Sequence, residues 1–160
     1  PLSDNPSRKP LRLRAGTATI ASANTYRAFI ARFFPLLPPA QYEPFVTWRM
    51  RVAGSSEFER FAQAAALTYQ MIYREPVRAL YSTLSMPVLL TAGSKDRSAP
   101  LIGYATAEAK ARMPGIHEAA QQAMADLRFG RFVSFPDVGH VPHLERPARF
   151  RAELLSFLKS

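Results

Sequence analysis

The chain has 160 residues, 48% of them hydrophobic, which is enough for one globular domain with an apolar core. It contains no cysteine, and this excludes disulfides, thiolate nucleophiles and zinc-thiolate sites. No run approaches the roughly 18 consecutive apolar residues that span a bilayer. We therefore expect a soluble protein without a membrane span, either cytoplasmic or periplasmic or secreted after processing.

The charge is strongly basic, because 21 Lys and Arg residues outnumber 12 Asp and Glu residues and give a formal net charge of +9. Apart from a cluster between Arg8 and Arg14, the basic residues are scattered singly among apolar and acidic neighbours. Folds that bind nucleic acid usually show a basic stripe or a recognisable motif, so we expect no nucleic-acid partner. The weaker alternative, electrostatic binding through residues 8–14, predicts an affinity that falls steeply with salt.

Helices are predicted for most of the first half of the chain. Residues 1–14 mix proline, polar and basic residues without periodicity, which is typical of an extended segment. Apolar residues then recur at helical spacing in three stretches, 24–34, 41–52 and 56–75. Asn24 is the expected N-cap of the first helix, and Ser56 with Glu59 forms an expected capping box for the third. A short helix and a turn are expected at 77–85.

Strands are predicted only in the second half. The run MPVLLTAG at 86–93 is opened by proline and closed by glycine, as in a strand buried on both faces of a parallel sheet. Helical composition at 105–128 precedes a second strand, RFVSF at 131–135, and an amphipathic helix is expected at 147–159. A strand, a crossover and a strand indicate a parallel pair in an α/β fold. Two strands are too few for an independent sheet, so we expect an incomplete one.

Chemistry is expected where the two strands end. In open α/β sheets, ligands bind beyond the carboxyl ends of the strands, so the loops after Gly93 and Phe135 should share one rim. The first loop carries Asp96 and the second carries His140. A carboxylate bound to one imidazole nitrogen fixes the tautomer and leaves the other nitrogen as a general base. We therefore expect Asp96 and His140 to form an acid–base pair.

These segments resemble the carboxyl-terminal part of the α/β-hydrolase superfamily. The shared features are G-x-x-D at 93–96, G-H-x-P-H-x-E-x-P at 139–147, and the closing helix. The resemblance implies Asp96 as the catalytic acid and His140 as the catalytic base, with Gly139 letting the backbone turn to place the imidazole. It also implies two parts: an amino-terminal segment with a helical cap at 1–84, and the carboxyl-terminal part of the hydrolase core at 85–160.

The nucleophile that the resemblance implies is absent from this sequence. A nucleophile elbow needs G-x-S-x-G, and although Gly54 and Gly93 precede serines, neither is followed by the second glycine. We therefore expect the chain alone to be inactive and its partner to be the amino-terminal part of the same hydrolase, as a cleaved or separate chain. The implied reaction is Ser-His-Asp hydrolysis of a small-molecule ester without cofactor or metal. Two alternatives stay open: a dehalogenase or epoxide-hydrolase type of enzyme with an Asp nucleophile, and a non-catalytic hydrolase-like interaction module.

Structural roles are expected for the other residues that could carry chemistry. His143 should support packing or hydrogen bonding, His117 should lie on a helix surface, and Asp137 should cap a turn. A set of aromatic residues in the first half of the chain could line a substrate pocket, but most of them should belong to the core. The set is Phe33, Phe34, Trp48, Phe61, Tyr69 and Tyr73.

Overall fold

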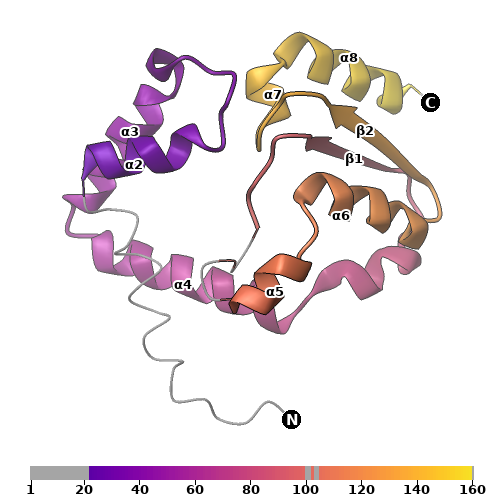
Figure 1. Cartoon of the computed structure of the whole chain (residues 1–160), viewed down its shortest axis with the longest axis horizontal. Helices are drawn as coiled ribbons and strands as arrows, with labels where there is room; N and C mark the ends of the chain where they lie inside the picture. Colours follow the sequence, from indigo (N-terminus) through magenta and orange to yellow (C-terminus); the bar gives the residue numbers. More distant parts are fainter. Residues whose placement is uncertain (1–21, 100–101, 103–104, 160) are drawn as a thin grey trace. The chain divides into compact units, whose positions relative to one another are not determined.

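The structure is a computed structural model of the chain and describes residues 22–99, 102 and 105–159 (Figure 1). The extended segment and basic cluster predicted at 1–14 lie outside the described residues. Contacts divide the chain into two units: unit 1 is Pro1–Ile30 with Pro38–Glu75, and unit 2 is Ala31–Leu37 with Pro76–Ser160. The functional division between residues 84 and 85 stays a prediction.

Unit 1 is helical. Its helices are α2 (Ala23–Ala31), α3 (Pro39–Ala53) and α4 (Phe58–Arg74). Their buried side chains follow the helical spacing of the sequence and include Ile30, Tyr42, Val46, Ala62 and Ala66. The three helices predicted for this region are therefore present, and α2 ends a few residues earlier than expected.

Both predicted helix caps in unit 1 are wrong. The Ser22 hydroxyl accepts a hydrogen bond from the Thr25 amide at 3.1 Å, so Ser22 takes the role predicted for Asn24. Helix α4 begins after Glu57, which makes no side-chain cap, and the Ser56 capping box does not form. Ser22 and Asn24 flank the start of α2, and Ser55, Ser56 and Glu57 precede α4; apolar periodicity alone does not select the capping residue among them.

Core positions in unit 1 were also over-predicted. Trp48 and Tyr73 are both 57% exposed, although most of the aromatic set to which they belong was expected in the core. The indole of Trp48 packs edge-on against Phe61, with ring centroids 6.3 Å apart. The Arg49 guanidinium lies over the Phe61 ring at 4.4 Å. Trp48 and Phe61 thus pack against each other, with the Arg49 guanidinium over the Phe61 ring.

Unit 2 contains the sheet. Its elements are η1 (Val77–Thr83), β1 (Val88–Gly93), α5 (Ala107–Arg112), α6 (Ile116–Ala123), η3 (Met124–Asp126), β2 (Gly130–Phe135), α7 (Pro142–Glu145) and α8 (Pro147–Leu158). Strands β1 and β2 pair in parallel, from Val88 opposite Gly130 to Gly93 opposite Phe135. The predicted parallel pair is confirmed, and α7 is a helix that was not predicted.

Helices α6 and α8 cover opposite faces of this sheet (Figure 1). Successive side chains of a strand point to alternate faces. Phe132 meets the His117 ring of α6 at 5.3 Å, whereas Phe135 meets Phe150 of α8 at 6.3 Å. Phe135 and Val138 are fully buried and centre the core of this unit.

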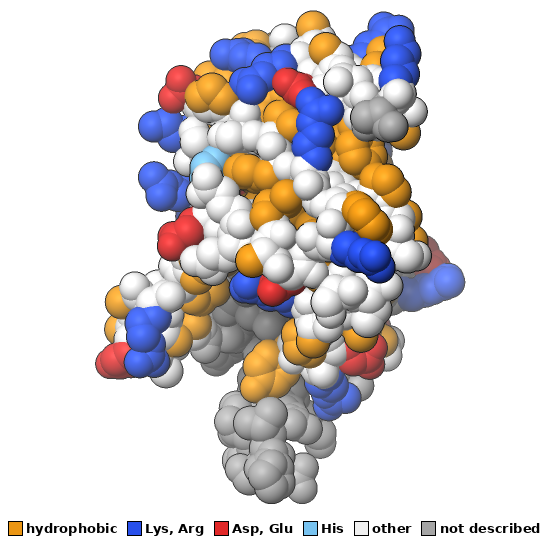
Figure 2. All heavy atoms as spheres, turned by 90° about the vertical axis from the view of Figure 1, so that its right-hand side faces the viewer, with side chains coloured by type: hydrophobic (Ala, Val, Ile, Leu, Met, Phe, Trp, Pro, Cys, Tyr) orange, Lys and Arg blue, Asp and Glu red, His pale blue; other side chains and the backbone are white. Residues whose placement is uncertain are grey.

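Burial of the strands is uneven. Only Ala92 and Gly93 of β1 are buried, so the prediction of a strand buried on both faces is wrong for its first four residues. Large apolar side chains are exposed in the same unit, among them Val77, Leu80, Met86, Phe129 and Leu158. Figure 2 shows one face of the molecule on which hydrophobic side chains, in orange, lie open between basic ones.

None of the helices among the described residues has the length and apolar character needed to cross a membrane.

Candidate functional site

The loops that follow β1 and β2 contact each other directly. The Ser94 amide donates to the Phe135 carbonyl and the Lys95 amide to the Val138 carbonyl, both at 2.9 Å. Gly93 permits this approach, because a Cβ at this position would collide with the carbonyl oxygens of Val138 and Gly139. The two loops thus form the shared rim that the parallel strands predict.

Asp96 and His140 meet on this rim. The carboxylate Oδ2 of Asp96 lies 2.9 Å from Nδ1 of His140. The Asp96 side chain is only 4% exposed, whereas that of His140 is 51% exposed. Among the described residues, Nε2 of His140 has no hydrogen-bond partner. One ring nitrogen is therefore held by a buried acid, and the other is open to an incoming group.

The electrostatics of the pair favour its charged form. The hydrogen bond to Asp96 raises the pKa of His140 above its usual range, against the opposing effect of burial. Burial by itself would raise the pKa of Asp96, but hydrogen bonds from His140 and Ser98 outweigh it and lower that pKa. Asp96 is thus an ionised carboxylate beside an imidazole with increased basicity.

Ser98 completes the immediate surroundings of the pair. Its amide donates to Oδ1 of Asp96 at 2.8 Å, and its Oγ lies 2.9 Å from Nδ1 of His140. A serine nucleophile must face the ring nitrogen that the acid does not occupy. Because Ser98 shares Nδ1 with Asp96, it does not meet this requirement and is not the nucleophile.

Glu145 ties the histidine loop to the segment that joins α2 and α3. Its carboxylate is buried, with the residue 5% exposed. Oε1 accepts a hydrogen bond from the Gly139 amide at 2.8 Å, and Oε2 accepts one from the Leu36 amide at 2.9 Å. The residue before His140 is therefore fixed by a buried carboxylate.

The same segment also touches His140 itself. The His140 amide donates to the Phe33 carbonyl at 2.9 Å, and the Phe33 ring stands edge-on to the imidazole at 5.5 Å. A Cβ on Gly139 would collide with the Phe33 carbonyl oxygen and the Pro35 ring. Gly139 has no positive φ, so it is needed for close approach and not for the turn that we expected.

Three other residues were given structural roles from the sequence. His143 packs against the Phe150 ring at 5.7 Å, as expected. Asp137 lies in the turn with a φ of 63°, a conformation that Asp tolerates better than most residues. His117 was wrongly placed on a helix surface: its Nε2 lies 2.7 Å from Oγ of Ser134 on β2, so it packs on the sheet.

Sequence reasoning missed Ser98 and the role of Glu145. An aspartate side chain often accepts a hydrogen bond from the backbone amide two residues on, and this turn pattern was the available signal for the Ser98 amide. Glu145 matched the hydrolase motif, but its hydrogen bond to Leu36 joins residues 109 positions apart. No local pattern encodes such a contact.

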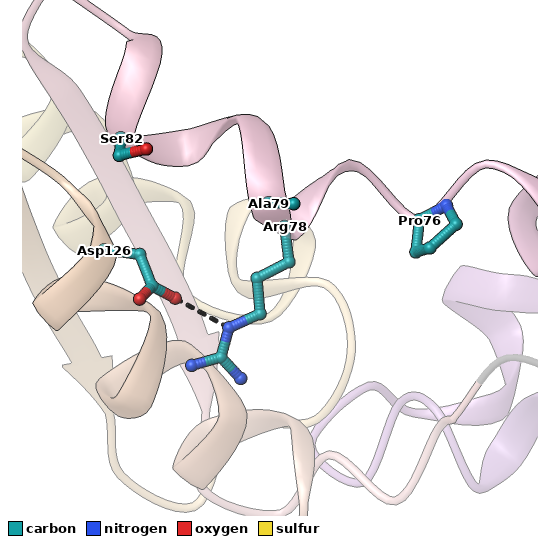
Figure 3. A pocket seen from close by; sticks show the side chains of 5 residues that line it. All are labelled: Pro76, Arg78, Ala79, Ser82 and Asp126. Carbon is teal, nitrogen blue, oxygen red and sulfur yellow. Dashed lines mark hydrogen bonds and ion pairs between the residues drawn. The ribbon is translucent and has the colours of Figure 1, made fainter.

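A depression lies at the other end of the sheet. Pro76, Arg78, Ala79, Ser82 and Asp126 line an open hollow of about 470 Å³ (Figure 3). Figure 3 shows Arg78 reaching toward Asp126, with Nε and Oδ2 at 2.7 Å. Arg78, Ala79 and Ser82 lie on η1, directly after Pro76, and Asp126 lies on η3. Both elements precede the strands, whereas His140 follows the carboxyl end of β2. Among the described residues no three His, Asp or Glu side chains gather as a metal site would require.

Fold and site together define an α/β protein with a carboxylate–imidazole pair beyond the carboxyl ends of its parallel strands. Residues 3–153 match the sequence profile of the alpha/beta hydrolase family. The match covers most of the chain, so the chain belongs to the α/β-hydrolase family.

A solved structure supports the same assignment. It is described as a probable hydrolytic enzyme from Pseudomonas aeruginosa PAO1, and this chain resembles it with a TM-score of 0.85 and 28% sequence identity. The alignment covers 96% of this chain and 48% of that one, so the chain spans about half the length of the structure that it matches. No curated protein matches the sequence.

Proposed function

We propose that this chain is the carboxyl-terminal half of a hydrolase that cleaves carboxylic esters by a Ser-His-Asp mechanism. The observation that carries the proposal is the buried Asp96 carboxylate on Nδ1 of His140, with Nε2 left open. His140 is the general base and Asp96 is the acid that orients it. The nucleophile comes from polypeptide outside this sequence, either as an amino-terminal segment or as a second chain, and unit 1 serves as a cap.

Each step then has a place for the proton. A serine hydroxyl adds to the ester carbonyl carbon while Nε2 of His140 takes its proton. His140 returns this proton to the leaving alcohol oxygen as the C–O bond breaks, and an acyl-enzyme ester remains. Water then loses a proton to Nε2 and attacks the acyl carbon. His140 passes this proton to the serine Oγ as the acyl–oxygen bond breaks, which releases the carboxylic acid and restores the serine. Asp96 keeps its bond to Nδ1 throughout and stabilises the imidazolium.

A carboxylate nucleophile is compatible with the same pair. In that case His140 activates water against an alkyl-enzyme ester, as in dehalogenases or epoxide hydrolases. A fluorophosphonate probe separates the two reactions, because it labels an activated serine and leaves an aspartate unlabelled. Mass spectrometry of the labelled protein also shows which polypeptide carries the nucleophile.

Two observations favour a non-catalytic module instead. The 160 residues contain no G-x-S-x-G, and large apolar side chains of unit 2 are exposed. A module of this kind would bind a partner through these side chains without turning over substrate.

Gel filtration with intact mass analysis tests whether the active enzyme contains polypeptide besides this chain. We expect a second polypeptide, or a longer chain, in the purified active protein; a stable lone monomer contradicts this part of the proposal.

The decisive test is the hydrolysis of a short-chain p-nitrophenyl ester by the assembled protein, that is, this chain with the polypeptide that supplies the nucleophile. We expect His140→Ala to remove almost all turnover and His143→Ala to keep it. His143 is a matched control because its imidazole lies three positions beyond His140, on α7, and packs against the Phe150 ring. Equal activity of wild type and His140→Ala would refute the assignment of His140 as the general base.

A further inference from the structure

Ser98 contacts both members of the acid–base pair, yet the mechanism above uses neither its hydroxyl nor its amide. We propose that Ser98 is a positioning residue that holds Asp96 and the His140 imidazole in the one arrangement that leaves Nε2 as the base. This inference rests on the proposed hydrolase function and adds a residue to its site. Ser98 lies in the loop after β1, two positions beyond Asp96.

The amide of Ser98 orients the carboxylate. It donates to Oδ1 of Asp96 at 2.8 Å, which closes a turn from the aspartate side chain onto its own backbone. With Oδ1 held in this way, Oδ2 faces Nδ1 of His140 at 2.9 Å. The rotation of the Asp96 side chain is therefore set by Ser98 and not by the histidine alone.

The hydroxyl of Ser98 acts on the imidazole. Its Oγ lies 2.9 Å from Nδ1, the same nitrogen that faces Asp96. A proton on Nδ1 thus meets two oxygen acceptors, whereas an unprotonated Nδ1 would place its lone pair against a carboxylate. The site favours the tautomer with hydrogen on Nδ1, and this tautomer has a free lone pair on Nε2. The hydroxyl proton in turn is available to the Asp96 carboxylate.

The charged groups near the pair do not replace the contact between the Ser98 hydroxyl and Nδ1 of His140. The Glu145 carboxylate is engaged by the amides of Gly139 and Leu36. Lys95 and Asp137 face each other across the two loops, with Nζ and Oδ1 4.0 Å apart. Among the described residues, Asp96 and Ser98 are the two side chains within hydrogen-bond distance of Nδ1 of His140.

Ser94 provides a matched control. It lies in the same loop, and its hydroxyl also bridges to the loop after β2, where it accepts the Asp137 amide at 2.9 Å. Among the described residues, the Ser94 hydroxyl forms no hydrogen bond with Asp96 or His140. A serine that merely stabilises the loop should therefore behave like Ser94, whereas a positioning residue should affect the imidazole.

The test compares Ser98→Ala, Ser98→Cys, Ser98→Thr and Ser94→Ala in the assembled protein. Nitrogen-15 NMR of the imidazole measures the tautomer of His140, and ester hydrolysis measures kcat and KM. We expect Ser98→Ala to increase the tautomer with hydrogen on Nε2 and to lower kcat about tenfold at unchanged KM, the size expected for one hydrogen bond to a charged pair. Ser98→Thr should restore both, because it keeps the hydroxyl.

Ser98→Cys keeps the size of the side chain with a weaker hydrogen bond, so it should shift the tautomer even if the alanine variant folds poorly. Ser94→Ala should leave tautomer and kcat unchanged. A wild-type tautomer in both Ser98→Ala and Ser98→Cys would overturn the inference, and so would an equal effect of Ser94→Ala. The two proposals can fail separately. A wild-type protein without esterase activity would refute the ester reaction. The NMR measurement of the His140 tautomer needs no turnover, so it would still decide the role of Ser98.

Discussion

The two ends of the β1–β2 sheet differ in how they use charge. At the carboxyl end, the carboxylates of Asp96 and Glu145 are buried, and backbone amides donate to both. At the amino end, Arg78 and Asp126 form an ion pair whose side chains are 54% and 37% exposed. Six residues of strand, about 20 Å, separate the two ends.

The difference shows which end is built for chemistry. Burying a carboxylate is costly unless hydrogen bonds compensate it, so a site that keeps two of them is held by specific contacts. An exposed ion pair forms at little cost and specifies little. The open hollow of about 470 Å³ lies at the amino end, and the charged groups among its lining residues are the exposed pair Arg78 and Asp126. Its size therefore does not make it the catalytic site.

The largest effect should follow Asp96→Asn. The amide presents either a hydrogen-bond donor to Nδ1 or a weaker acceptor, so the imidazole loses the tautomer that places a base at Nε2. We expect kcat for ester hydrolysis to fall by roughly 10⁴-fold with the fold retained. Circular dichroism and the kinetics of the assembled protein measure the two quantities. Near-wild-type kcat would mean that the acid lies elsewhere.

Glu145→Gln should act on stability more than on chemistry. The carboxylate accepts two backbone amides, and a glutamine keeps one acceptor while its NH₂ group faces the other amide. An unsatisfied buried donor costs about 1–3 kcal/mol, and we expect a decrease of this size in the free energy of unfolding. Urea denaturation measures it.

Glu153→Gln is the control for that measurement. Glu153 pairs with Arg131 at 2.9 Å but remains partly exposed, so its loss should cost no more than about 1 kcal/mol. If both variants lose the same stability, the contrast between the buried carboxylate of Glu145 and a surface pair is wrong.

The pH dependence should report the raised pKa of His140. A general base works when it is neutral, so kcat/KM should rise with pH through a midpoint above the ordinary histidine value of about 6.5. Asp96→Asn removes the carboxylate that raises this pKa, and the midpoint of its residual activity should move to lower pH. A midpoint that stays in place would show that Asp96 does not set the basicity of His140.

The sequence was sufficient to predict the helices, whose apolar residues recur periodically, and the side chains that follow the ends of the strands. Apolar spacing predicted the helices, and the strand ends located Asp96 and His140 on one rim, because parallel strands align their carboxyl ends. It was insufficient where distant segments meet. The contact of Glu145 with Leu36 and the need for a glycine at position 139 both depend on the α2–α3 segment, whose approach no local pattern encodes. His117 was misplaced for the same reason, since its partner Ser134 lies on a strand.

The smallest effect should follow Arg78→Ala at the amino end of the sheet. Arg78 loses one ion pair to Asp126 and a weak contact at 3.5 Å to the Gln122 carbonyl, all largely in solvent. We expect a change below about 1 kcal/mol in the free energy of unfolding and an unchanged kcat. Urea denaturation and ester hydrolysis, run beside Asp96→Asn, test both. An exposed ion pair affects turnover only when it touches the substrate. If Arg78→Ala removed activity while Asp96→Asn kept it, the catalytic site would therefore lie at the amino end of the sheet, beside the hollow.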